Sequence, residues 1–483
     1  MARSAPMPVF RLVLLASAAL AASPALADDL REALVSAYNT NPQLQAARAQ
    51  QRAVDEGVPI QKSAALPSLS GTASYVENIR KSFANTPDRA LDLSASASMP
   101  LYSGGSIKNS IRAAKTRVEA GQNDLRAAES GVFSQVVAAY MDVILNQAVV
   151  GLNRSNVDRL GVNLQATRDR FEIGDLTRTD VAQSQSRLSL ARSQTRSAEA
   201  QLIGARERYI QVVGKEPVNL QPPPPLPGLP DSVEDAVTFA LDHNPDLLAA
   251  RQRSKAAGYD VAVAGAGRLP RVSVFTSADR LDYLGSAVSS VPNVAPNQTS
   301  TSAQAGVRAS IPLFQGGLPA ALRRQAQARE SATLEQEIGI EREVIASVRA
   351  AYAQWKAAGD VIVSSQTAVE AATLSLEGVR AENTVGNRTI LNILDAEQEL
   401  LNAQVNLVTA RRNAYVAGFN LLSAMGKGEA EDLGLDGGPL YDPVANYDRV
   451  RNAIFDWSSD PAPVAKSTRT VDTKAQDGSI PAQ

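Results

Sequence analysis

The same succession of motifs occurs twice along this chain, which restricts the fold to one built from two related halves. Residues 33–48 (ALVSAYNTNPQLQAAR) are matched 203 residues later by 236–251 (AVTFALDHNPDLLAAR). Further on, residues 100–105 (PLYSGG) are matched by 312–317 (PLFQGG) at an offset of 212. Nine residues are therefore inserted between these marks in the second half. The proline-rich run at 221–230 (QPPPPLPGLP) cannot continue a helix and separates the halves as an extended linker.

Within each half, apolar side chains recur every seven residues over long stretches. The positions are Val136, Val143, Val150, Val157, Leu164 and Phe171 in the first half, and Val348, Trp355, Ile362, Val369 and Leu376 in the second. A strict seven-residue repeat indicates left-handed supercoiled helices. We predict two antiparallel helical hairpins, at 105–214 and 317–426. At 1.5 Å per residue, the first helix of each hairpin would be roughly 100 Å long.

Between the helical stretches the apolar period changes to two, as in β-strands. The predicted strands lie at about 68–75 and 90–100 in the first half, and at about 272–282 and 303–313 in the second. Weak alternation in short segments is typical of membrane barrel strands. Four strands cannot close a barrel, and an open sheet edge is forbidden in lipid. The fold class is therefore mainly α with a membrane β portion, and several chains must share one barrel.

Composition excludes several classes of function. The chain has no cysteine and one histidine, His243, so disulfides, thiolate catalysis and Cys/His zinc sites are excluded. His243 lies where the first half has Thr40, so the shared fold does not require it. No catalytic group, cofactor or metal site is predicted. The chain has 48 Lys and Arg against 50 Asp and Glu, and its basic residues do not form a block. The sequence therefore gives no indication of a nucleic-acid partner.

The two ends of the sequence differ from the repeats. Arg3 and Arg11, the apolar stretch 12–22 and an A-x-A site at Ala25 to Ala27 predict a signal peptide at 1–27. No cysteine follows that could carry a lipid, so the mature chain would begin at Asp28 without one. We predict the division 28–220 for the first repeat, 221–230 for the linker, 231–426 for the second repeat, 427–459 for an equatorial segment and 460–483 for a disordered tail.

These features together resemble the TolC family of outer-membrane channel-tunnels. The resemblance rests on the N-P helix starts, the Leu-Pro and Pro-Leu-Tyr/Phe-x-Gly-Gly marks of each half, and VGNRTILNILDAEQELLNAQ at 385–404. It implies a homotrimer in the cell outer membrane, whose twelve strands form one barrel above a periplasmic helical tube. It also implies passive export of secreted proteins or small toxic molecules. The implied partners are a periplasmic adaptor (membrane fusion) protein and an inner-membrane ABC or proton-driven transporter.

The resemblance further implies a gate at the periplasmic helical tip. The matching residues are Arg388 of VGNRT and Thr179 and Asp180 of RTDV. An arginine fork and a carboxylate make a bidentate, charge-assisted contact. The family's tyrosine partner for the arginine is replaced here by Asn383. On the residues alone, the favoured interpretation of Arg388 is a solvated residue at a helix start.

The family's channel entrance carries two aspartates one helical turn apart. Asn392 and Asp395 occupy those positions here, so one acidic ring is retained and the other is neutral. A ring of Asp395 carboxylates would favour cations. The first half has Gln183 at the position of Asp395, so helix packing does not require the charge. The plain alternative is a lone exposed aspartate.

Two other classes of protein share part of this pattern. A periplasmic coiled-coil adaptor or scaffold of an export system also has a long helical hairpin, but normally one per chain. A general diffusion porin consists of strands throughout. Two hairpins and two strand pairs favour the channel-tunnel over both.

Overall fold

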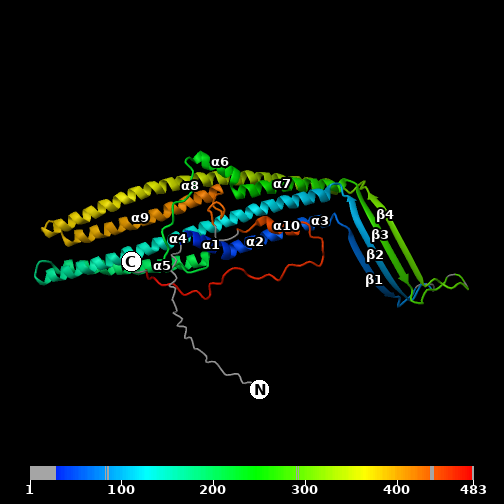
Figure 1. The fold of residues 1–483 in the computed structure, drawn as a ribbon, viewed down its shortest axis with the longest axis horizontal. Helices are drawn as coiled ribbons and strands as arrows, with labels where there is room; N and C mark the ends of the chain where they lie inside the picture. Colours follow the sequence, from blue (N-terminus) through cyan, green and yellow to red (C-terminus); the bar gives the residue numbers. More distant parts are fainter. Residues whose placement is uncertain are drawn as a thin grey trace, which may run out of the picture.

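A computed structural model describes residues 29–81, 83, 86–289, 291, 293–435 and 440–480. The predicted signal peptide at 1–27 lies outside the described residues. The helices form a long rod, and the strands form one sheet at one end of it (Figure 1). The two halves of the chain lie side by side along the rod, so that each contributes to the helices and to the sheet.

Four long helices of the described chain make the rod. They are α4 (Ser106–Glu172), α5 (Arg178–Val213), α8 (Leu318–Thr384) and α9 (Ile390–Met425). The bounds of α8 and α9 are those of α4 and α5 moved by 212 residues. Helices α4 and α8 have 67 residues each, which corresponds to about 100 Å. Each folds back into its shorter partner, and both turns lie at the end of the rod away from the sheet (Figure 1).

The seven-residue apolar repeat forms the core of these helices. Phe133, Val136 and Tyr140 of α4 are fully buried against Leu202 and Tyr209 of α5. Among the described helices, one stretch of α4 is long and apolar enough to cross a membrane by composition. In the single chain 39% of that stretch is buried, and Phe133, Val136 and Tyr140 belong to the interior of the bundle.

Seven shorter helical segments flank the rod within the described ranges. They are α1 (Leu30–Thr40), α2 (Pro42–Asp55), α3 (Gly57–Ser63), α6 (Val233–His243), α7 (Pro245–Gly265), the 3₁₀ helix η1 (Ala266–Arg268) and α10 (Pro443–Val450). The repeated Asn-Pro motif joins α1 to α2 and α6 to α7. Asn41 caps α2 and donates to the carbonyl of Val212 at 2.8 Å, whereas Asn244 caps α7 and donates to Ala424 at 2.9 Å. Each asparagine thereby starts one helix and binds the last turn of a hairpin.

The sheet contains β1 (Ser68–Glu77), β2 (Arg89–Tyr102), β3 (Arg271–Asp282) and β4 (Thr299–Ser310). All neighbours are antiparallel, in the order β1-β2-β3-β4. Pairing of β2 with β3 joins the two halves, with Ser96 opposite Ser277. Within the described chain, β1 and β4 each keep one edge without a partner strand.

The last strand differs from the prediction of 303–313. It begins at Thr299 and ends at Ser310, which pairs with Arg271 at the start of β3. The alternating Ile311 and Leu313 suggested a longer strand, but Pro312 has no N–H to donate to a ladder. The other three strands begin within one residue of the predicted positions, and β1 and β2 end two residues later than predicted.

Of the predicted disordered tail 460–483, the structure describes residues 460–480. Residues 460–480 form an irregular segment that returns along the rod (Figure 1). Arg206 donates to the carbonyls of Asp477 at 2.6 Å and Ser479 at 2.8 Å, and Arg154 donates to Gly478 at 3.0 Å. The polar composition of this segment predicted disorder. Composition gives no information about the two arginines, one in α4 and one in α5, that bind the backbone of the segment.

Gly426 provides a test of this packing. Its φ is +83°, and an added Cβ would lie 2.6 Å from the carbonyl oxygen of His243. Gly386 has nearly the same φ, +84°, with nothing near an added Cβ. Gly386→Ala should cost about 1 kcal/mol of unfolding free energy from backbone strain, and Gly426→Ala about 2 kcal/mol more from the clash. Urea unfolding followed by circular dichroism measures both; equal losses would contradict the close approach to His243.

Candidate functional site

The predicted gate residues lie at the two hairpin turns, where the backbone is built in the same way twice. Thr177 caps α5 and Thr389 caps α9. Asp180 Oδ2 accepts from the backbone N–H of Thr177 at 2.9 Å and from its hydroxyl at 2.7 Å. Asn392 Oδ1 accepts from the corresponding groups of Thr389 at 3.1 and 2.9 Å. Both predicted site residues are therefore the third residues of capping boxes.

The cap changes the acidity of Asp180. The Thr177 hydroxyl and then its N–H donate to the carboxylate, and they lower the pKa of Asp180. The carboxylate therefore stays charged at neutral pH and carries a negative charge at the turn. Thr179, beside it, is exposed. Asn392 gives the second turn the same cap without the charge.

Arg388 is paired within its own turn. Its Nε donates to Oε2 of Glu382 at 2.7 Å, and both side chains are about half exposed. Asn383, at the position of the family's tyrosine, donates to the carbonyl of Arg388 at 2.6 Å. A single chain does not bring Arg388 into contact with Asp180, which lies on the other hairpin.

Asp395 is placed between the hairpins. Its carboxylate pairs with Arg187 of α5, while the side chain remains half exposed. Beneath this pair, Leu394 packs against Leu160, Leu164 and Leu188 of the first hairpin. The second hairpin is thus held to the first near the tip by an apolar cluster and an ion pair.

Glu397 is a further residue of this contact, and sequence reasoning missed it. Its side chain is 1% exposed. Asn163 of α4 donates to both carboxylate oxygens at 2.9 Å, and Arg380 of α8 donates to Oε1 at 2.7 Å. Glu397 lies between the buried apolar residues Ile393 and Leu400, one helical turn from each, so a charge on the apolar side of α9 was the available signal.

The first half again provides an internal comparison. Gln185 stands at the position of Glu397, and Arg168 at that of Arg380. Arg168 donates to Oε1 of Gln185 at 2.8 Å, so the hydrogen bond within the hairpin exists in both halves. Glu397 also binds Asn163 of the other hairpin. Its negative charge therefore serves the contact between hairpins, because the contact within a hairpin is made equally by a neutral glutamine.

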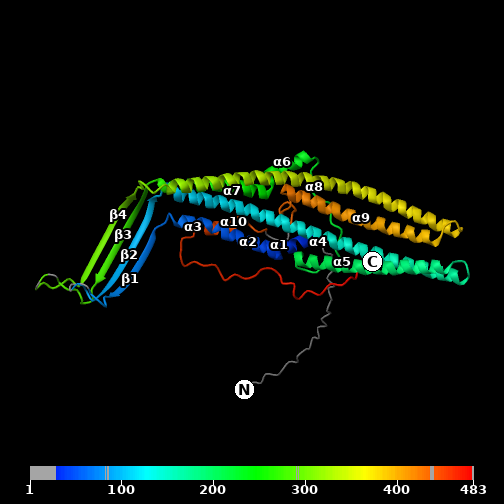
Figure 2. The same ribbon diagram turned by 180° about the vertical axis from the view of Figure 1, so that it is seen from behind.

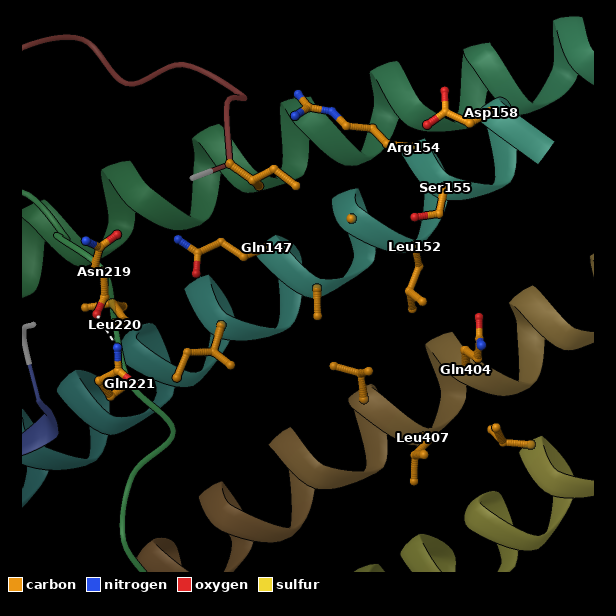
Figure 3. Close-up of a pocket in the computed structure, with 16 residues that line it drawn as sticks. Gln147, Leu152, Arg154, Ser155, Asp158, Asn219, Leu220, Gln221, Gln404 and Leu407 are labelled. Carbon is orange, nitrogen blue, oxygen red and sulfur yellow. Dashed lines mark hydrogen bonds between the residues drawn. The ribbon is translucent and has the colours of Figure 1, made fainter. Parts of the chain in front are cut away.

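A groove of about 1110 Å³ opens between the hairpins farther from the tip (Figure 3). Leu152 of α4 points toward Gln404 and Leu407 of α9 across it, whereas Gln147 points toward the linker at Asn219 and Leu220 (Figure 3). The lining mixes polar and apolar groups. Among the residues that the structure describes, no group of three or more His, Cys, Asp or Glu side chains could hold a metal ion.

His243 takes part in a local contact. It is the last residue of α6, its Nδ1 lies 3.0 Å from the carbonyl oxygen of Phe239, and its ring stacks on the Phe239 ring.

The described residues combine a set of polar links at the ends of long hairpins with a sheet that has two unpaired edges. That combination fits the channel-tunnel class that the sequence resembles.

Comparison with known families agrees with this class. The chain belongs to the outer membrane efflux protein family, whose model matches residues 33–215 and 237–427. The protein is 33% identical over 444 residues to the outer membrane efflux protein BepC of Brucella suis, covering 92% of this chain and 95% of the relative. It is 28% identical to the outer membrane protein TolC of Vibrio cholerae, covering 87% and 96%.

Solved structures show the same fold. The outer membrane protein VceC of Vibrio cholerae superposes with a TM-score of 0.70 at 21% identity, covering 82% of this chain and 96% of that one. The CmeC outer membrane channel of Campylobacter jejuni gives 0.72 at 17% identity, covering 88% and 89%. The protein is thus an exit duct of the outer membrane that extends into the periplasm, and the periplasmic adaptor interpretation is not favoured.

Removing Glu397 should loosen the contact between the hairpins. Glu397→Ala leaves Asn163 and Arg380 without their acceptor and should cost about 2 kcal/mol. Amide hydrogen exchange should accelerate in α4 around Asn163 and in the first turns of α9. Gln185→Ala is the matched control, because it removes the corresponding side chain within the first hairpin. It should leave the amide exchange rates around Asn163 and in the first turns of α9 unchanged. Equal acceleration in both variants would contradict a role for the charge.

Proposed function

We propose that three copies of the chain form one closed tunnel, with twelve strands in a shared barrel. The observation that carries this proposal is the pair of unpaired edges on β1 and β4 of the described sheet. Within a bilayer nothing but another strand can satisfy those backbone groups. Joining β4 of each copy to β1 of the next closes a ring, and three copies give the even number of twelve strands.

The helices support the same assembly. Leu322, Leu334, Ile338, Val361 and Leu374 of α8 are between 44% and 71% exposed in the single chain. Exposed apolar side chains along so long a helix need partner surfaces. These five point in several directions around α8, so in the proposed trimer they are covered both by the first hairpin of the neighbouring copy and by other parts of the assembly, and twelve long helices surround the channel.

Cross-linking between edge strands tests the assembly. The chain has no native cysteine, so Ser70→Cys in β1 and Gln304→Cys in β4 introduce the only thiols. Both side chains point to the same face of the sheet, because the register runs from Ser70 through Ser96 and Ser277 to Gln304. Under oxidation in the outer membrane, the double variant should give covalent trimers, because every copy carries both edges. Each single variant should stay monomeric on denaturing gels and serves as the control. Trapping of dimers alone, or a stable native monomer, would refute the shared barrel.

The duct is passive in this proposal. An inner-membrane transporter, ABC type or proton-driven, supplies the energy, and a periplasmic adaptor joins it to the tip of the helices. Secreted proteins or small toxic molecules then cross to the exterior. Residues 28–220 and 231–426 form the two repeats of each wall segment, and residues 427–459 form an equatorial segment around them.

The gate of the proposed tunnel lies at the hairpin turns. In the closed trimer, Arg388 exchanges its bond to Glu382 for Thr179 and Asp180 across a subunit boundary. The half-exposed Arg388 lies in the turn between α8 and α9. The charged Asp180 lies in the first turn of α5, just after the turn between α4 and α5. Both turns project at the same end of the rod, which supports this arrangement (Figure 2). Asp395 is paired with Arg187 in the single chain but remains half exposed, and in the trimer it supplies a ring of three carboxylates at the entrance, next to neutral Asn392.

Conductance in planar bilayers tests the gate. Arg388→Ser and Asp180→Ala should each raise the resting conductance several-fold, and the double variant should add little, because both remove the same contact. Asp395→Ala is the contrasting variant: it should lower cation preference and block by trivalent cations without opening the channel. Wild-type conductance in Arg388→Ser would mean that some other contact closes the tip.

A further inference from the structure

Three cations follow one face of the first turns of α4, next to the sheet. Lys108, Arg112 and Lys115 are spaced four and three residues apart, so they lie above one another on the helix surface. All three are exposed, and in the part of the chain that the structure describes no carboxylate pairs with any of them. The first turn of α4 contains no acidic residue. Cations near the positive end of a helix dipole are unfavourable, so this arrangement lacks a counter-charge.

The cationic face is not directed toward the neighbouring helices. Ala114 and Val118 of α4 pack against Val58 of α3. Asp124 of α4 pairs with Arg253 of α7. With 3.6 residues per turn, the three cations fall on a third side of α4. Their charges therefore meet solvent or a molecule from outside the chain.

An apolar cavity of about 520 Å³ lies beside the cations. Leu101, Tyr102, Ile107 and Ile111 supply most of its apolar lining, and Lys108, Arg112 and Lys115 line its polar side. The cavity lies where β2 ends and α4 begins, at the end of the sheet nearest the helices (Figure 2). A site with a cationic rim and an apolar floor matches a molecule that has an anionic head and a hydrocarbon tail.

A second set of exposed side chains lies near the same level. Lys62 of α3 donates to the carbonyl of Arg451 at 2.5 Å and to Asn452 at 2.9 Å, so the segment after α10 is anchored beside α3. Burial and then the charges of Lys115 and Arg451 lower the pKa of Lys62. Beyond this anchor, Phe455 and Trp457 are 72% and 88% exposed. Exposed tryptophan beside cations is typical of segments that rest in a membrane interface.

The second half of the chain shows that the fold does not demand these cations. The residues 212 positions later are Ala320, Arg324 and Gln327, and Arg323 replaces the apolar Ile111. The same helix start therefore forms in α8 with one of the three cations and with only part of the apolar floor, because Leu313 and Phe314 match Leu101 and Tyr102. Packing of the helix start therefore does not explain the cationic cluster.

We propose that Lys108, Arg112 and Lys115 bind the headgroup of an anionic phospholipid of the inner leaflet of the outer membrane, with its acyl chains on the apolar cavity. The proposal rests on the placement of the sheet in the membrane given above, since that placement puts the end of β2 at the periplasmic leaflet. Phe455 and Trp457 enter the same interface. The bound lipids set the depth of the barrel in the membrane.

Native mass spectrometry of detergent-purified trimers tests the site. Trimers are selected first by their heat-modifiable migration, so that a failure of the shared barrel shows as missing trimers. They are then mixed with phosphatidylglycerol or phosphatidylcholine of identical acyl chains. The wild type should retain phosphatidylglycerol preferentially. Each neutralised cation should weaken binding about fivefold, so Lys108→Gln/Arg112→Gln/Lys115→Gln should bind both lipids alike.

Two controls test whether the lipid binds at this particular site. Arg324→Gln neutralises the equivalent position of α8 and should keep the wild-type preference. Inorganic phosphate at equal concentration should not displace the lipid, because it cannot occupy the apolar cavity. If the triple variant assembles poorly, Lys115→Gln alone should still give about a fivefold loss. Equal retention of both lipids by the wild type, an unchanged preference in the triple variant, or full displacement by phosphate would overturn the proposal.

Discussion

The unpaired edges of β1 and β4 dictate how the other parts of the molecule are arranged. A bilayer offers no water to those backbone groups, so in the proposed assembly other copies must supply the missing strands. Closing that ring would also arrange the helices, because each half of the sheet leads into a long helix, α4 or α8. Long helices that leave a ring of strands would stand around the same axis, where exposed apolar side chains of α8 would meet neighbouring copies.

The regular parts of this fold could be predicted because periodicity is a local property. Val136 and Leu202 follow a seven-residue grid, and their burial is what that grid indicates. Irregular backbone gives no such signal. The end of β4 depends on a pairing between Arg271 and Ser310, far apart in sequence. The tail depends on Arg206 reaching its carbonyls, which no composition measure detects.

The candidate site divides in the same way. Thr177 with Asp180, and Thr389 with Asn392, follow the capping-box spacing, so their local role was readable from sequence. The hydrogen bond between Glu397 and Asn163 was not readable from sequence, because these two residues are 234 positions apart and lie on different hairpins. A buried glutamate on an apolar grid signals that a partner exists. Only the packing of the hairpins shows which residue that partner is.

The duplication itself separates residues that build the fold from residues that serve a purpose. Both halves form the same turns and helix starts, so a charge found in one half alone is not required by packing. Glu397 stands against Gln185, Asp180 against Asn392, and Lys108 against Ala320. These three differences lie toward the two ends of the rod, two near the turns and one beside the sheet. Arg154 and Arg206 also have no charged counterpart, since Gln366 and Gly418 stand at their positions, but they bind the backbone of the chain's own tail. A charge present in one half alone therefore marks a contact that the repeated fold does not supply, either within the chain or, as proposed for Lys108 and Asp180, with another molecule.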